Sequence, residues 1–129
     1  MKTAILSVPL RAGLAAAVLT MTPFPAFAQD APLSHVANPA IYKVLAEDSQ
    51  FRVVLGTWKP GQRDELHSHP ANATYALTGC DLRLYGPDNK VLVELARPQG
   101  SAVLQNPVAA HVFENTDTSE CRILIVERK

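Results

Sequence analysis

The sequence predicts a small antiparallel β-barrel for residues 41–129. Stretches rich in β-branched and aromatic residues are short, and turn-forming residues separate them roughly every 8–12 positions. Outside the first 28 residues, no window shows the 3.6-residue periodicity of an amphipathic helix. No repeat of solenoid length is present either. Together these observations favour a single all-β domain, built as a sandwich or a barrel.

The first 28 residues have the order of a secretory signal peptide. Basic residues at Lys2 and Arg11 precede an apolar run over residues 12–21, and Ala-Phe-Ala ends at Ala28. The apolar run is too short to span a hydrocarbon core of about 30 Å. We therefore expect residues 1–28 to be a signal peptide cut after Ala28, and the protein to be periplasmic or secreted.

The rest of the chain has the size of one compact domain with a modest core. The full sequence has 12 basic and 12 acidic residues, so removal of Lys2 and Arg11 with the signal peptide leaves a net charge near −2. Since no basic patch stands out, the sequence argues against nucleic acid as a partner. After cleavage of the signal peptide we expect no membrane association.

Residues 29–40 read as a linker, because prolines and small polar residues occur there without periodicity. From Ile41 onward, the strands follow one another with turns between them. "IYKVLAE" and "FRVVLGTW" flank the turn "DSQ", and "CDLRLYG" and "VLVEL" flank "PDNK". The remaining expected strands are "ATYAL", "AVLQ", "AAHVFEN" and "CRILIVERK".

Two histidines stand two residues apart in "PGQRDELHSHP". Residues i and i+2 of a strand point to the same face, so His67 and His69 would project side by side. His111 lies in another expected strand and would complete a group of three in a closed barrel. His35 falls in the linker and is left out. An H-x-H pair with a third histidine favours a metal site over three unrelated polar residues.

The spacing of these residues resembles the two sequence motifs of the cupins. The first motif matches as G-x5-H-x-H and the second as a glycine followed by H-x3-N, at Gly61, His67, His69, Gly100, His111 and Asn115. The resemblance extends from about residue 41 to residue 127 and is strongest to small single-domain bacterial cupins. It implies an RmlC-like jelly roll, also called a double-stranded β-helix, with a metal bound inside the barrel.

The first motif departs from the cupin pattern at its glutamate. That position would fall at Ala73 or Thr74, and neither is a carboxylate. The resemblance therefore implies a metal bound by His67, His69 and His111 alone, which keeps the full 2+ charge and open coordination positions. Glu65 could supply a carboxylate by its parity with His67, or it could belong to a solvated loop. Three imidazoles accept iron, zinc, manganese or nickel and do not select among them.

This resemblance implies a small molecule as ligand or substrate, with oxygenase-like or isomerase-like chemistry. Whether the protein is an enzyme stays open, because a non-catalytic ligand-binding cupin and a metal-free structural barrel fit the same residues. Dimerisation is common among cupins, so a homodimer is one expected arrangement.

A few other residues carry expectations. Cys80 and Cys121 each alternate with apolar residues, and in an exported chain they could form a disulfide or remain buried thiols. Trp58, Tyr75 and Phe113 are candidates for the wall of the pocket, with Tyr75 the best placed as a general acid. Asn115 is expected to fix a turn rather than contact the metal.

Overall fold

The structure is a computed structural model that describes residues 31–129. The expected signal peptide, residues 1–28, lies outside the described residues. One helical turn and nine strands follow in chain order. They are α1 (Ser34–Ala37), β1 (Tyr42–Glu47), β2 (Phe51–Trp58), β3 (His67–His69), β4 (Asn72–Ala76), β5 (Cys80–Tyr85), β6 (Val91–Arg97), β7 (Ala102–Gln105), β8 (Val108–Asn115) and β9 (Cys121–Arg128).

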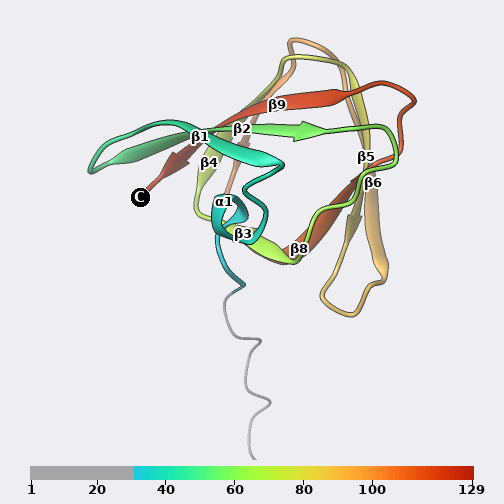
Figure 1. Cartoon of the computed structure of the whole chain (residues 1–129), viewed down its shortest axis with the longest axis horizontal. Helices are drawn as coiled ribbons and strands as arrows, with labels where there is room; N and C mark the ends of the chain where they lie inside the picture. The colour runs from blue at the N-terminus through green and yellow to red at the C-terminus, as the bar shows by residue number, and fades with distance from the viewer. Residues whose placement is uncertain (1–30) are drawn as a thin grey trace, which may run out of the picture.

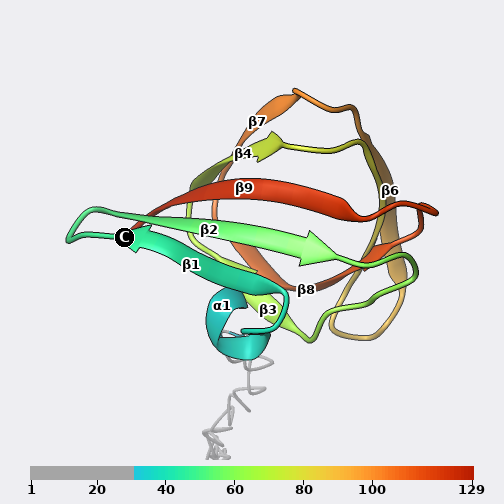
Figure 2. The same cartoon turned by 45° about the horizontal axis from the view of Figure 1, so that its top comes forward.

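Two sheets make up the barrel, and all of their strand pairs are antiparallel (Figure 1). The larger has the order β1-β2-β9-β4-β7, and the smaller has the order β3-β8-β5-β6. The last strand, β9, therefore lies between β2 and β4. Strands β6 and β7 are edge strands of different sheets, on one side of the barrel (Figure 2). The predicted all-β jelly roll is confirmed.

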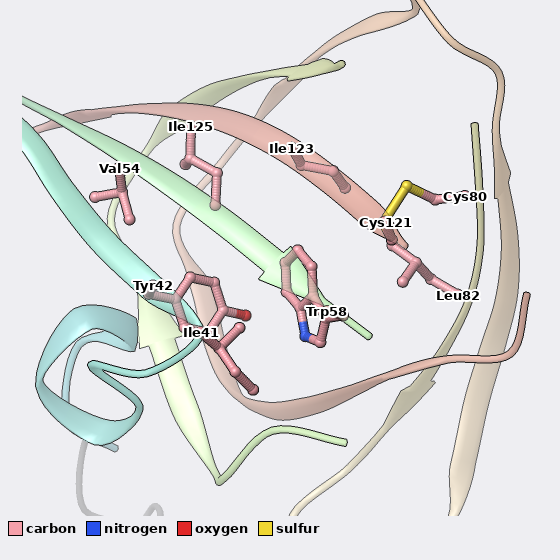
Figure 3. Close-up of a cluster of buried hydrophobic side chains, with 9 residues drawn as sticks. All are labelled: Ile41, Tyr42, Val54, Trp58, Cys80, Leu82, Cys121, Ile123 and Ile125. Carbon is pink, nitrogen blue, oxygen red and sulfur yellow. A yellow bond between two sulfur atoms is a disulfide. The ribbon is translucent and has the colours of Figure 1, made fainter. Parts of the chain in front are cut away.

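The core forms because β2 and β9 alternate strictly between inward and outward residues. Every second residue of each strand is buried, and the residues between them are half-buried or exposed. The inward side chains of both strands meet those of β1 and β5 in one cluster (Figure 3). Its members are Ile41, Tyr42, Val54, Trp58, Cys80, Leu82, Cys121, Ile123 and Ile125. Tyr42 of this cluster contacts His67, so the apolar core adjoins the histidines inside the barrel.

A disulfide joins the two sheets. Cys80 is the first residue of β5 and Cys121 is the first residue of β9, and their Cα atoms are 5.1 Å apart. Both side chains are buried in the apolar cluster, as Figure 3 shows. Of the two alternatives that the sequence leaves open for these cysteines, the structure contains the disulfide.

The segment before β1 packs against β3. Leu33 forms a parallel bridge with Ser68, whose backbone N–H donates to the carbonyl of Pro32 at 2.9 Å. The Ser68 hydroxyl donates to the carbonyl of Ala31 at 2.6 Å. Residues 31–37, which fall in the expected linker, are thus attached to the strand that carries two histidines. Across residues 31–129, no helix has the length and apolar character needed to cross a membrane.

Candidate metal centre

Strand β3 is only three residues long and consists of His67, Ser68 and His69. The alternation of a strand turns both histidines inward and Ser68 outward. In the register of β3 with β8, His67 lies directly opposite His111. One ligand atom of each of the three histidines lies within 4.8 Å of the others, and all three side chains are buried. The three histidines that the sequence singled out therefore meet inside the barrel.

Each imidazole is held from behind through Nδ1. His67 Nδ1 donates to the carbonyl of Glu65 at 2.8 Å, and His111 Nδ1 donates to the carbonyl of Ala109 at 2.7 Å. His69 Nδ1 donates to the carboxylate of Glu127 at 2.8 Å. These partners can only accept, so the hydrogen-bond network assigns the proton of every ring to Nδ1. All three Nε2 atoms then carry a free lone pair.

The three Nε2 atoms converge, and in this tautomer none of the three rings can donate a hydrogen bond to another. His67 Nε2 and His69 Nε2 are 3.1 Å apart, and His111 Nε2 is buried with no hydrogen-bond partner. Two lone pairs at this distance repel each other, and a buried acceptor without a partner is costly. A cation between the rings would remove both penalties. The donor set therefore fits a divalent metal, which imidazole binds through such a lone pair.

Burial keeps two of the histidines neutral. Loss of solvation, together with the neighbouring His111, lowers the pKa of His67 to about 3. Loss of solvation also lowers the pKa of His111 to about 4, although its bond to the Ala109 carbonyl acts in the opposite direction. Neutral imidazoles are the form that binds metals, so these rings are available as ligands without prior loss of a proton.

A buried tyrosine places an oxygen beside the histidines. Tyr42 OH lies 3.0 Å from His67 Nε2 and 2.6 Å from Asp64 Oδ2. Burial, and then the neighbouring Asp64, raise the pKa of Tyr42 well above its ordinary value, so the hydroxyl keeps its proton. The Tyr42 hydroxyl donates this proton to Asp64. A lone pair of the Tyr42 oxygen therefore faces the histidines.

Asp64 anchors this corner of the site from the loop before β3. Its carboxylate accepts the Tyr42 hydroxyl, the Trp58 indole N–H at 3.2 Å and the Phe113 backbone N–H at 2.7 Å. Burial raises the pKa of Asp64 to about 6, even though these hydrogen bonds lower it. The alternation of side chains along a strand could not place Asp64 beside His67 from the sequence, because the residues between them are not in a strand.

The missing carboxylate of the cupin motif has a counterpart behind the site. Ala73 and Thr74 lie in β4, and Glu127 of β9 contacts His69 instead. Glu127 is 0% exposed, and Arg52 contacts its other oxygen at 3.2 Å. Burial acts to raise the pKa of Glu127, but His69 and Arg52 outweigh it and lower the pKa. Glu127 is thus anionic. A carboxylate thus lies one imidazole away from the expected metal, and it is paired with Arg52 on its other side.

Other expected residues fall into place around the site. The Glu65 side chain is exposed, and only its carbonyl contacts His67, so it is not the substitute carboxylate. Tyr75 is 46% exposed and does not line the cavity, which makes its assignment to the pocket wall wrong. Trp58 and Phe113 do line it. Asn115 fixes a turn as expected, since its Nδ2 donates to the carbonyl of Ser119 at 2.8 Å.

A cavity of about 90 Å³ adjoins the histidines inside the barrel. His69 and His111 lie in its wall together with Tyr42. Most of the remaining wall is apolar and comes from both sheets, with Trp58, Leu82, Leu84, Leu95, Val108, Phe113, Ile123 and Ile125. Asn72, Thr74, Arg97 and Gln105 add polar groups. The cavity can therefore receive a small molecule next to His69 and His111.

Fold and site together define a small jelly-roll protein with three buried histidines in its barrel. A cupin domain from Bordetella pertussis Tohama I is similar, with a TM-score of 0.62 and 19% identity over 78% of this chain and 98% of that one. A protein from Thermus thermophilus is similar with a TM-score of 0.51 and 22% identity, over 71% of this chain and 87% of that one. The Cnp3 cupin domain of Schizosaccharomyces pombe is similar with a TM-score of 0.52 and 8% identity, over 68% of this chain and 59% of that one.

These similarities show that the chain has the cupin fold, which confirms the resemblance seen in the sequence motifs. No protein-family model and no curated protein matches the sequence. At these levels of identity the fold is shared, whereas activity has to be argued from the site itself.

Proposed function

We propose that His67, His69 and His111 bind one divalent transition metal through Nε2, and that the protein binds or transforms a small molecule there. The observation that carries this proposal is the convergence of three buried Nε2 lone pairs, each fixed by a partner at Nδ1. Three protein ligands leave coordination positions open. A bound ion would supply Lewis acidity to a ligand in the cavity. Iron, zinc, manganese and nickel all suit the ligand set.

The surrounding residues have separate roles in this proposal. Glu127 holds the proton of His69 on Nδ1 and increases the basicity of its Nε2. Tyr42 presents an oxygen acceptor toward the cavity, because its proton is bound by Asp64. The apolar wall excludes water and binds the carbon skeleton of the ligand.

Metal analysis tests the proposal directly. The wild type, a His67→Ala/His69→Ala variant and a His35→Ala variant would each be offered equal amounts of the four metals, dialysed and analysed for elements. We expect about one metal per chain in the wild type and in His35→Ala, whose histidine lies in α1 and is not one of the three that converge. The double variant should lose it. Equal metal contents in all three proteins would contradict the proposal and favour a metal-free structural barrel.

A non-catalytic ligand-binding protein is the second candidate. It is favoured because no carboxylate lines the cavity and the Tyr42 proton is already bound by Asp64. The described residues thus offer no free general acid or base at the cavity wall. Oxygen uptake by the iron-loaded protein with small thiols and carboxylates separates the candidates. Turnover that depends on His67 supports the enzyme, and ligand binding without turnover supports the binding protein.

We further propose that the chain is exported. The order of charges and apolar residues in residues 1–28 supports this, and so does the Cys80–Cys121 disulfide, since disulfides persist in oxidising compartments. Amino-terminal sequencing of the protein recovered from the periplasm or the medium should begin at Gln29. Recovery of intact Met1 from the cytoplasm would contradict export.

A homodimer through the outer face of the larger sheet is also proposed. Leu104 of β7 is 86% exposed and Tyr75 of β4 is 46% exposed, and their strands are paired. Exposed apolar side chains on one sheet face are typical of protein–protein contacts. Light scattering should report twice the mass of one chain, and Leu104→Lys should reduce it to one. An unchanged mass in that variant would contradict this interface.

A further inference from the structure

The hydroxyl oxygen of Tyr42 lies among the histidine nitrogens. Tyr42 is the first residue of β1 and is 1% exposed, and its ring carries the oxygen away from that strand into the barrel (Figure 3). The oxygen is 3.0 Å from His67 Nε2, and His67 Nε2 is 3.1 Å from His69 Nε2. His67 Nε2 therefore has two polar neighbours at nearly the same distance, one from each sheet.

The contact between Tyr42 and His67 has no proton in it. The proton of His67 is on Nδ1, which donates to the carbonyl of Glu65 at 2.8 Å. The Tyr42 hydroxyl donates its proton to Asp64 Oδ2 at 2.6 Å, a shorter distance than the 3.0 Å to His67. The oxygen and the nitrogen thus face each other with lone pairs, and such a contact is unfavourable unless a donor or a cation joins them.

Asp64 holds the hydroxyl in this orientation. The carboxylate is buried, and besides the Tyr42 hydroxyl it accepts the N–H groups of Trp58 and Phe113. If Tyr42 turned its proton to His67, the buried Asp64 Oδ2 would have one donor fewer, which is costly. The lone pairs of the Tyr42 oxygen therefore stay directed at the histidine nitrogens.

The distances are those between neighbouring ligands of one ion. With bonds of about 2.1 Å, two ligands at a right angle, as in an octahedral site, are about 3.0 Å apart. Two ligands in a tetrahedral site are about 3.4 Å apart. The separations of 3.0 and 3.1 Å around His67 Nε2 match the right angle. Since tyrosine is also a known ligand of iron in proteins, the Tyr42 oxygen has both the position and the chemistry of a ligand.

We propose that Tyr42 is a fourth protein ligand of the metal bound by His67, His69 and His111. This inference rests on the proposed function, because it adds a ligand to that same metal. On binding, the Tyr42 O–H bond breaks and its proton passes to Asp64 Oδ2, to which the hydroxyl already donates. The total charge of Tyr42 and Asp64 is unchanged, and the metal gains an anionic oxygen ligand.

A phenolate ligand would replace the carboxylate that the first cupin motif lacks. The position of that glutamate falls at Ala73 or Thr74. Glu127 contacts His69 at Nδ1, the side of the ring away from the metal. Tyr42 reaches the metal side from β1 and precedes both motifs in the sequence, so the spacing of the motifs could not reveal it.

Iron(III) reports such a ligand directly, because phenolate bound to iron(III) gives an absorption band in the visible range. Metal-free protein would be titrated with iron(III) citrate, dialysed, and analysed for iron content and visible absorption. Tyr42→Phe removes only the oxygen. Tyr75→Phe is the matched control, since Tyr75 is 46% exposed and does not line the cavity.

A second measurement needs no substitution. Protein produced with ring-deuterated tyrosine would be compared with unlabelled protein by resonance Raman spectroscopy, with excitation in the visible band. Isotope shifts of the enhanced vibrations identify tyrosine as the ligand even if Tyr42→Phe fails to fold. Of the three tyrosines in the sequence, all within the described residues, Tyr42 alone lines the cavity.

We expect iron uptake and the visible band in the wild type and in Tyr75→Phe. Tyr42→Phe should still bind iron through the histidines but should lose the band. Iron in the wild type without the band would overturn this inference and leave the metal site intact, and so would a band that persists in Tyr42→Phe. Binding of zinc without iron(III) would also overturn it, because a phenolate favours iron(III). A wild type that takes up neither metal would refute the proposed metal site and this inference with it.

Discussion

Gly61 and Gly100 show which parts of the cupin motifs are backbone requirements. Their φ angles are 70° and 81°, in the left-handed region where a side chain is strained. Asn115 likewise fixes the backbone, through hydrogen bonds to the carbonyls of Trp58, Lys59 and Ser119. The motif glutamate has no such backbone role. Its replacement at Ala73 or Thr74 therefore changes the chemistry of the site while the fold persists.

Glu127 is expected to control the affinity for metal without binding it. In Glu127→Gln, a neutral amide replaces the anion that polarises His69, so zinc affinity should fall roughly 10- to 100-fold. Competition with a chromogenic chelator measures this change. Glu120→Gln is the matched control, since Glu120 is exposed. Equal affinities in the two variants would show that Glu127 is only a structural partner of Arg52.

The buried titratable groups predict how the stability of the metal-free protein depends on pH. His67 and His111 have folded pKa values of about 3 and 4, below the ordinary 6.5, so from pH 6 to pH 4 only the unfolded chain protonates them. Asp64, with a folded pKa of about 6, binds one proton in the folded state over that interval. In this interval the unfolded state thus binds one proton more than the folded state. The free energy of unfolding should therefore fall by about 1.4 kcal/mol for each unit by which the pH is lowered.

Urea unfolding in the presence of a chelator at pH 4.5, 5.5 and 6.5 measures this dependence. His111→Gln should flatten it, because one of the two histidines that gain a proton on unfolding is removed. A wild-type stability that stays constant or rises toward pH 4.5 would contradict the assignment of neutral buried histidines.

At the level of elements, the strands were predictable because their residues alternate or are β-branched. The expected strand at residues 51–58 coincides with β2, and that at residues 102–105 coincides with β7. The pair His67 and His69 could be placed on one face by the same alternation. His111 was placed by its motif spacing, which reflects the register of β3 with β8.

The remaining parts of the site depend on contacts between distant residues. Glu127 is 58 positions from His69, and Tyr42 is 22 positions from Asp64. Neither pair has a local pattern, since both are brought together only when the sheets close. The packing of residues 31–37 on β3 is of the same kind. A single sequence therefore predicted the three histidines that come together but not the groups that orient them.

Ser68 tests whether the segment before β1 supports β3. Ser68→Ala removes the hydroxyl that donates to the Ala31 carbonyl, which should cost about 1 kcal/mol. Hydrogen exchange of the Val36 and Ala37 amides, which donate to the carbonyl of Leu33, should then accelerate. Ser49→Ala, in the exposed turn between β1 and β2, is the control. Equal exchange rates in the two variants would contradict this support.

For the whole molecule, the disulfide is a cross-link between the sheets in addition to the loops that connect them. In the chain-entropy model, a closed loop of 41 residues contributes roughly 4 kcal/mol. The Cys80→Ala/Cys121→Ala variant should therefore lose about that much unfolding free energy in urea, and the reduced wild type should match it. Labelling of both cysteines by a thiol reagent in denatured, unreduced protein would contradict the bond.

The two ends of the barrel are joined in different ways. Cys121 begins β9 and Glu127 lies near its other end, so the disulfide end and the histidine end are about 20 Å apart along one strand. At the histidine end, the chain crosses between the sheets twice through two-residue connections, from β3 to β4 and from β7 to β8. The disulfide thus anchors the end of the barrel that these short connections do not.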